Sequence, residues 1–410
     1  MADPLIQAEM LMTRGRFADA RKLLDEQAAH ESGEQKRDNQ VQFLLGLLDM
    51  QDKDYDGAIA HFHRVLVSEP NQVRVRLELG RAYFLKNDYA NAQRQFLYAR
   101  AGKLPKAVLT NIDRFLSAIR QKKTFTWTLT FAVVPDSNLN AGPATDTVSL
   151  YGLPFQLSPD ARANSGVGLS ADLGAEWSPR IGERTKWRLG AGLHRVQYRQ
   201  TEFDDMTLSV YTGPHLTLKR WDINLLGNVA RRWFGDRPYS ISYGPSADVT
   251  YYLNQRLGLG LAASLSQVNY HLNPLQNGLN ASVSGSFFLA SSPSSFIRGG
   301  VTIGRQEARF PGYAYESRQV GLSYTRELPG GITVGLAPSV TFLNYDAALA
   351  AFTAPRRDRQ YAAQVSVLDR KIVWFGLTPR IAYTVIRNNS NIALYTFKRN
   401  RFEIGLTSTF

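Results

Sequence analysis

The chain has 410 residues, of which 44% are hydrophobic and 20% charged, with a net charge of +13 and no cysteine. The lack of cysteine excludes disulfides, thiolate metal sites and cysteine nucleophiles. The longest apolar run, FLLGLL at 43–48, is far shorter than the roughly 18–20 residues of a membrane-spanning helix. A membrane-spanning β-barrel remains open, because its strands alternate apolar and polar residues.

The positive charge is spread along the whole chain. There are 20 basic and 16 acidic residues up to Lys123, and 28 basic and 19 acidic residues beyond it, which gives +4 and +9. Because no basic tract stands out, we expect no nucleic-acid partner. We expect the excess to face solvent and the anionic headgroups of outer-membrane lipid and lipopolysaccharide. The start, MADPLIQAEM, lacks a basic n-region and an apolar core, so we expect a mature N-terminus left after signal removal.

The first 120 or so residues have helical periodicity and contain a repeat. Segments 43–65 and 77–99 align 34 residues apart, matching Leu45 with Leu79, Gly46 with Gly80, Asp54 with Asp88, Tyr55 with Tyr89, Ala58 with Ala92 and Phe62 with Phe96. That period resembles the tetratricopeptide repeat. A weaker copy lies at 15–24, and an amphipathic helix at 107–121 would cap the stack. We predict a tetratricopeptide-like helical domain over residues 1–121.

The first helix of each repeat lines the concave groove of such a stack, and the groove suits a peptide or protein partner. By repeat position, the predicted groove residues are Gln40, Phe43 and Leu47 in the second repeat and Arg74, Glu78 and Arg81 in the third. The alternative is that these residues form only a solvated face.

After Lys123 the hydrophobic period changes from helical to two. In the first segment Phe125, Trp127, Phe131 and Val133 share one face, with threonines opposite. The alternating segments run about 10–15 residues, and small residues dominate the other face, which favours tilted membrane strands over a β-sandwich. About 14 segments follow this pattern, near 124–134, 161–177, 185–198, 206–218, 221–233, 239–253, 256–270, 277–290, 295–307, 314–327, 331–345, 359–369, 373–387 and 400–410. We predict a transmembrane antiparallel β-barrel over residues 122–410.

The connections between these segments predict an orientation. Those after even-numbered segments are mostly tight, and the long ones, at 135–160, 346–358 and 388–399, follow odd-numbered segments. Short turns face the periplasm in barrels of Gram-negative bacteria, and long loops face outside. We therefore expect residues 1–121 and the C-terminus in the periplasm. The terminal Phe410 resembles the signal that outer-membrane assembly machinery reads.

No catalytic site, cofactor or metal site is predicted. The six histidines are scattered, and serine-hydrolase, nucleotide-binding and zinc-protease motifs are missing, so we expect no enzyme. The polar cluster Asp136, Asn138 and Asn140 in PDSNLN imitates the start of a calcium loop. Its sixth position is Ala141 and its twelfth is Thr147, so calcium is the minor interpretation. We favour an Asx-rich loop start that shapes the loop or gates the lumen.

A helical-repeat domain followed by a barrel whose first strand runs into PDSNLN at 135–140 resembles the surface lipoprotein assembly modulator (Slam) family. The resemblance covers most of the chain. It implies translocation across the outer membrane of a protein cargo, either a surface lipoprotein or a secreted haem- or metal-scavenging protein. The helical repeats would engage the cargo or a periplasmic chaperone. The alternatives are an exporter of polysaccharide and a passive diffusion porin with a periplasmic binding domain.

Overall fold

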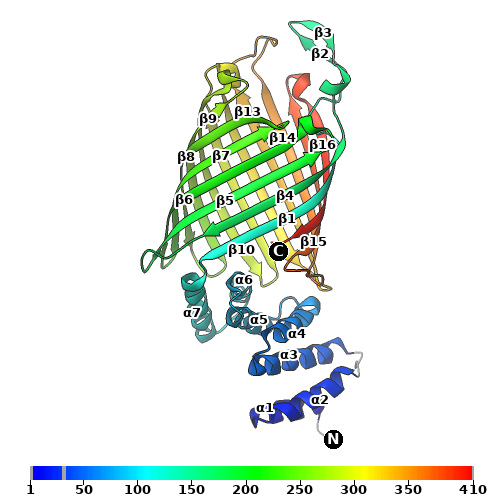
Figure 1. Ribbon diagram of the computed structural model, residues 1–410, viewed down its shortest axis with the longest axis vertical. Helices are drawn as coiled ribbons and strands as arrows, with labels where there is room; N and C mark the ends of the chain where they lie inside the picture. The colour runs from blue at the N-terminus through cyan, green and yellow to red at the C-terminus, as the bar shows by residue number, and fades with distance from the viewer. Residues whose placement is uncertain (1–2, 30–33, 409–410) are drawn as a thin grey trace. The chain divides into compact units, whose positions relative to one another are not determined.

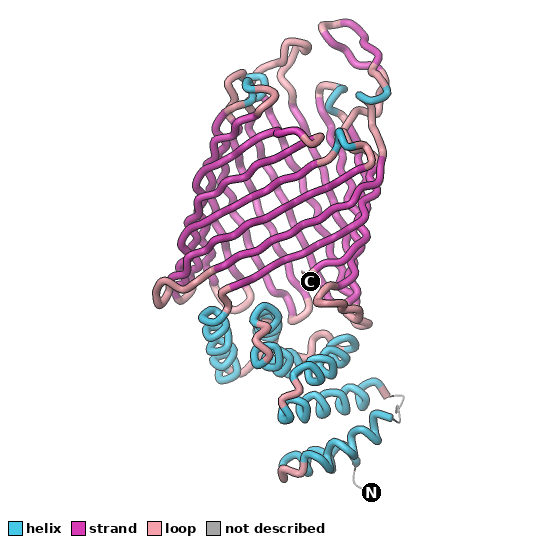
Figure 2. Tube along the Cα trace, viewed as in Figure 1, coloured by secondary structure: helices cyan, strands magenta, loops and turns pink. Residues whose placement is uncertain are grey.

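The computed structural model describes residues 3–29 and 34–408, and Phe410 with its predicted assembly signal lies outside them. The chain divides into two compact units (Figure 1). The first comprises the residues up to Lys123 together with the segments 290–296 and 326–333, and the second comprises the rest of the chain. Figure 2 shows the change from helices to strands along the chain.

The first unit contains the helices that the repeat pattern predicts. They are α1 (Pro4–Thr13), α2 (Phe17–Ala29), α3 (Gln35–Asp52), α4 (Tyr55–Ser68), α5 (Val73–Leu85), α6 (Tyr89–Arg100) and α7 (Lys106–Lys122). Helix α3 packs on α4, and α5 packs on α6, so each aligned repeat is one helical hairpin. None of the described helices is long and apolar enough to cross a membrane.

The two hairpins turn in the same way because residues at equivalent repeat positions end the first helix and start the second. Asp54 and Asp88 each accept a hydrogen bond from a backbone N–H three residues further on, at 3.0 and 3.1 Å. The preceding residues, Lys53 and Asn87, have φ values of 63° and 67°. The left-handed residue stops the first helix and the aspartate caps the second.

Glycine stands where the two helices of each hairpin touch. A Cβ atom at Gly46 would lie 2.6 Å from the ring of Phe62, and one at Gly80 would lie 3.1 Å from the ring of Phe96. Both rings are fully buried. The helices can approach this closely only because the glycines carry no side chain, which explains the Gly–Phe pairing in the repeat.

We expect Gly46→Ala to destabilise the α3–α4 hairpin by about 1–3 kcal/mol, because the added methyl group overpacks the core against Phe62. Gly80→Ala should cost less, since its closest contact is longer. Hydrogen exchange of the full-length protein, followed by mass spectrometry of peptides from α3 and α4, measures the effect. Gly285→Ala is the matched control because a Cβ there meets nothing within 4 Å. Unchanged exchange in Gly46→Ala would contradict the packing argument.

A buried arginine lies inside the first unit. Arg76 on α5 is 1% exposed. Its guanidinium donates to the carbonyl oxygen of Pro70 at 2.9 and 2.6 Å and to Gln95 Oε1 at 3.0 Å. It also pairs with Glu327, which belongs to the segment 326–333 of the same unit. A charge is tolerated in an interior only when it is paired and hydrogen-bonded, so these groups stabilise one another.

Within the described residues, 14 strands form one closed antiparallel barrel, which confirms the predicted barrel. They are β1 (Phe125–Asp136), β4 (Gly166–Trp177), β5 (Thr185–Tyr198), β6 (Asp205–Leu218), β7 (Trp221–Phe234), β8 (Arg237–Tyr252), β9 (Leu257–Tyr270), β10 (Gly278–Ser292), β11 (Ser295–Gln306), β12 (Tyr315–Glu327), β13 (Ile332–Tyr345), β14 (Arg357–Asp369), β15 (Thr378–Ser390) and β16 (Phe397–Thr407). Neighbours in sequence pair with each other, and β1 pairs with β16 to close the sheet.

Several predicted strand boundaries were wrong. The strand predicted to end at residue 134 continues through Pro135 to Asp136, and the strand predicted from residue 161 starts at Gly166 after a 3₁₀ turn. The last strand begins at Phe397 rather than at residue 400. The hairpin of β2 (Thr147–Leu150) and β3 (Leu153–Gln156), inside the longest loop, was not predicted. These boundaries depend on pairing partners, which alternation alone does not reveal.

The outer face of the barrel is apolar. Leu169, Ile303 and Ile404 are more than half exposed, and they alternate with small or polar residues that face inward. Aromatic residues gather on the outer face near the short turns, at Trp127, Trp177, Trp187 and Trp221. An apolar band with such a girdle is the surface that a barrel presents to a lipid bilayer.

Candidate functional site

The predicted polar cluster begins where β1 leaves its partner β16. Ser408 N–H donates to the carbonyl oxygen of Leu129 at 2.8 Å, and Ser137 N–H donates to that of Asn400 at 3.0 Å. The odd-numbered residues of β1 between these two points therefore direct their backbone groups toward β16. Pro135 is one of them and has no N–H, so the β1–β16 ladder lacks a donor there. Residues of β1 are paired with β16 from Thr130 to Val133 and again at Asp136, and the pairing is interrupted between them.

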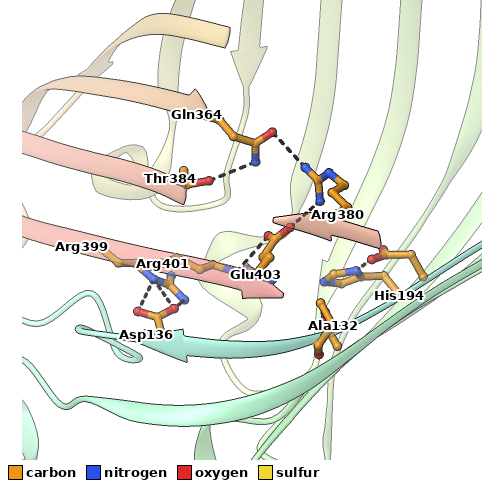
Figure 3. A network of polar contacts seen from close by, with 11 residues as sticks. Ala132, Asp136, His194, Gln364, Arg380, Thr384, Arg399, Arg401 and Glu403 are labelled. Atoms are coloured by element: carbon orange, nitrogen blue, oxygen red, sulfur yellow. Dashed lines mark hydrogen bonds and ion pairs between the residues drawn. The ribbon is translucent and has the colours of Figure 1, made fainter. Parts of the chain in front are cut away.

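An ion pair spans the same junction on the inner side of the barrel (Figure 3). The Asp136 carboxylate accepts from Arg399 Nε at 3.0 and 2.8 Å and from Arg399 Nη2 at 2.5 Å. It also accepts from the backbone N–H of Asn138 at 3.0 Å. Asp136 is buried, so this charge-assisted contact joins β1 to β16 just beyond the missing backbone bond.

The two asparagines tie the long loop to the barrel. The Asn138 amide donates to the carbonyl oxygens of Gly142 and Lys398, at 2.8 and 3.1 Å, and accepts from Gly142 N–H at 2.9 Å. The Asn140 amide donates to the carbonyl oxygens of Arg162 and Asp160, at 2.6 and 3.0 Å. Asn138 therefore holds the start of the loop against β16, and Asn140 holds the start of the loop against its end.

Polar contacts continue down the lumen on β14, β15 and β16. Arg380 donates to Glu403 at 2.8 Å and to Gln364 at 3.3 Å, and Gln364 donates to Thr384 at 3.0 Å (Figure 3). Glu403 also lies 3.3 Å from Arg401. Because Arg380 and Arg401 share the one carboxylate of Glu403, this part of the lumen wall is polar and carries a small net positive charge.

The contacts of Asp136 argue against the calcium interpretation. Its carboxylate oxygens already accept hydrogen bonds from Arg399, and a cationic guanidinium repels a metal ion at that position. Among the described residues, no group of three or more His, Asp or Glu side chains could hold a metal ion. The cluster is a hydrogen-bonded loop anchor in which side-chain amides replace backbone partners.

The predicted groove residues lie on α3 and α5. The Arg74 guanidinium on α5 lies 5.0 Å from the centre of the Phe43 ring on α3. The predicted groove residues of the two helices therefore form one continuous stripe. Arg81 lies 3.6 Å from Glu78 on the same stripe. Gln40 is exposed and contacts Glu9 of α1. Leu47 is different, because it packs against two hydrophobic clusters and serves the core.

Sequence reasoning missed Arg399 and the other charged partners on the last strands. The signal was present in KRNRFEIG at 398–405, where Arg399, Arg401 and Glu403 alternate with outward residues such as Phe402 and Ile404. Three charged side chains at a spacing of two belong to one face of a strand, and within the apolar band that face must be the one toward the lumen.

We expect Asp136→Ala to loosen the root of the long loop, at a local cost of about 2–4 kcal/mol, because the partly buried Arg399 loses its carboxylate partner. Limited proteolysis of the reconstituted protein should cut residues 137–165 at least several-fold faster than in the wild type. The matched control is Asp346→Ala, which removes a carboxylate from the exposed pair with Arg305. Equal protection in both variants would show that the buried pair does not hold the loop.

Comparison with known proteins places these features in a family. The family described as "Surface lipoprotein assembly modifier" matches residues 126–410, and a tetratricopeptide repeat matches residues 49–97. The Haemophilus influenzae protein "Surface lipoprotein assembly modifier 1" is 22% identical, over 88% of this chain and 76% of its own length. The Neisseria meningitidis serogroup B protein of the same description is 23% identical, over 90% and 75%. The Acinetobacter baumannii "Hemophilin secretion modulator" is 20% identical, over 85% and 74%.

The repeats, the closed sheet and its apolar outer face define an outer-membrane β-barrel with an N-terminal tetratricopeptide region. The family match extends from the first strand to the end of the chain. The chain belongs to the surface lipoprotein assembly modifier family, which confirms the resemblance seen in the sequence.

Proposed function

We propose that this protein moves a protein cargo across the outer membrane and displays or releases it at the cell surface. The observation that carries the proposal is the family match over the whole barrel, residues 126–410. The names of the relatives supply two cargo classes, surface lipoproteins and a secreted protein of the hemophilin kind. No catalytic step forms part of the proposal.

The wall of the lumen supports passage of a polypeptide. Several of its charged side chains form ion pairs, including Arg380 with Glu403 and Arg188 with Glu176. Small residues also face inward, including Gly174 and Gly192. A polar wall with paired charges keeps the lumen hydrated and does not bind a charged polymer tightly. This favours a protein as the cargo over an anionic or cationic polysaccharide.

The helical repeats are proposed to bind the cargo, or a chaperone that delivers it, in the periplasm. The stripe formed by Phe43 and Arg74 combines an aromatic ring with an exposed cation, a pairing enriched in protein-binding surfaces. Gln40, Glu78 and Arg81 extend the same stripe. Because the chain shows no nucleotide-binding motif, folding of the cargo outside or release from a chaperone is the proposed driving force.

Deletion of the gene, followed by quantitative proteomics of the cell surface and the medium, tests the function. We expect one or a few proteins to disappear from the surface or the medium and to accumulate in the periplasm. Unchanged surface and secreted proteins would contradict protein export. Loss of a surface polysaccharide would favour the polysaccharide exporter, and ion conductance without any lost protein would favour the porin.

The groove is tested in the same deletion strain by complementation. Arg74→Glu combined with Arg81→Glu reverses two charges on the stripe and should lower the amount of displayed cargo by about tenfold, since interface cations often contribute more than 1 kcal/mol each. The control combines Arg64→Glu with Arg120→Glu, which makes the same charge change at exposed residues outside the stripe. Equal loss in both double variants would show that charge alone, and not the groove, matters.

Protease treatment of intact cells tests the proposed orientation. Tyr151 in the β2–β3 hairpin is 68% exposed, so chymotrypsin should cut this loop from outside. The loop at 346–356 should also be accessible to a nonspecific protease. Residues 3–122 should be protected until the outer membrane is permeabilised. Cleavage within the helices in intact cells would overturn the orientation.

A further inference from the structure

Four cationic side chains lie together on the outer face of the barrel, at the end that carries the long loops. They are Arg357 and Arg359 on β14, Arg387 on β15 and Lys398 on β16, and all four are exposed. These three strands are neighbours in the sheet (Figure 1). Asp358, between the two arginines of β14, is buried, so alternation turns the arginines outward. We call these four residues the cation row.

The register of the sheet sets like charges against each other in this row. Arg387 lies directly opposite Lys398 on one side and Tyr361 on the other. Arg359 lies opposite Asn389, two residues from Arg387 on the same face. Like charges that face each other across a ladder destabilise a sheet, and an anion bound between them removes the repulsion.

The row differs from the other arginines at this end of the barrel. Within the part of the chain that the structure describes, none of its four cations forms an ion pair with a carboxylate, whereas nearby arginines do so. These pairs are Arg356 with Asp358, Arg399 with Asp136 and Arg305 with Asp346. The hydrogen bonds from Arg305 hold the pKa of Asp346 below its usual value, as expected for an internal pair. The cation row therefore has positive charge available for a ligand.

Apolar residues continue the same face toward the membrane centre. Tyr361 follows Arg359 by two residues, and Phe402 follows Lys398 by four, which places them about 7 and 13 Å further along their strands. Both rings are exposed, as is Ile404 beyond them. A ligand on this face thus meets cations at one end and apolar side chains at the other.

A groove of about 800 Å³ on the outer face adjoins the row. Its charged lining consists of Arg318, Arg357, Arg359 and Asp358, and the Asp358 carboxylate is paired with Arg356. Its apolar part is made by Val301, Ile303, Val320 and Phe342, of which Ile303 and Val320 are strongly exposed. The groove is large enough for acyl chains, and it shares two arginines with the cation row.

We propose that the cation row and this groove bind the lipid A part of lipopolysaccharide, with its phosphates on the cations and its acyl chains in the groove. Each phosphate carries about 1.5–2 negative charges near pH 7, so two phosphates match four cations. Arginine binds phosphate through paired N–H donors, which suits three of the four positions. The proposal depends on the outer-membrane location of the barrel and is independent of which cargo it carries.

The charge on the ligand separates lipid A from other membrane lipids. A zwitterionic phospholipid offers no net negative charge, and phosphatidylglycerol offers a single diester charge. Lipid A with one phosphate removed keeps the acyl chains and loses about half of the charge. Affinity should therefore fall in the order lipid A, monophosphoryl lipid A and phosphatidylglycerol, and added salt should weaken all three.

Native mass spectrometry of the purified full-length protein in detergent, titrated with lipid A, tests the site. The test variant carries Arg357→Gln, Arg359→Gln, Arg387→Gln and Lys398→Gln together. One cation near an anionic lipid surface changes affinity by about fivefold, so we expect binding to weaken by about a hundredfold or more. A second variant, Phe342→Ser, keeps the charges and should weaken binding through the acyl chains alone.

The control variant is Arg305→Gln with Asp346→Asn, which removes a paired arginine and its carboxylate at the same end of the barrel. It should bind lipid A as the wild type does, and circular dichroism should show an intact barrel in every variant. Wild-type affinity in the quadruple variant would overturn the proposal. Equal binding of lipid A and phosphatidylglycerol by the wild type would overturn it as well, since the row would then attract any anionic lipid without selecting lipid A.

Discussion

The barrel depends on one constraint, which is that every backbone N–H and C=O within the bilayer must find a partner inside the sheet. A sheet meets this requirement only by closing on itself, so the first strand must pair with the last. Pro135 removes one donor from that pairing, close to the end of β1. Directly after Pro135 in the chain, Asp136 pairs with Arg399, and the Asn138 amide donates to the carbonyl oxygen of Lys398. Side chains therefore supply the contacts to β16 that the backbone cannot.

The alternation of strand residues made the barrel predictable. One face must meet lipid and the other the lumen, so a period of two persists through all 14 strands whatever the individual residues are. The helical repeats were predictable for a similar reason, since Gly46 and Phe62 must fit each other just as Gly80 and Phe96 do. Both patterns record a constraint that every copy of the unit has to satisfy.

Features that depend on a distant partner were not predictable. The sequence shows Asp136, but nothing near it indicates that Arg399 will come within reach, because that requires the register of β1 on β16, in which Asp136 lies opposite Arg401. The hairpin β2–β3 has only four residues in each strand, too few for alternation to stand out from the surrounding loop. Arg76 occupies a helical position where an arginine would be expected at the surface, and only its contacts with Gln95 and Glu327 explain its burial.

The Asp136–Arg399 pair also has a consequence for the order in which the protein folds. Its two residues are 263 positions apart along the chain. Contacts this distant pay the largest loop-closure entropy unless intervening structure has already brought their ends together. Neighbouring hairpins of the barrel can form early and locally, whereas this pair forms only when the last strand meets the first. The long loop after β1 therefore acquires its anchored shape at the final step of assembly, and an incompletely inserted barrel would expose it unanchored.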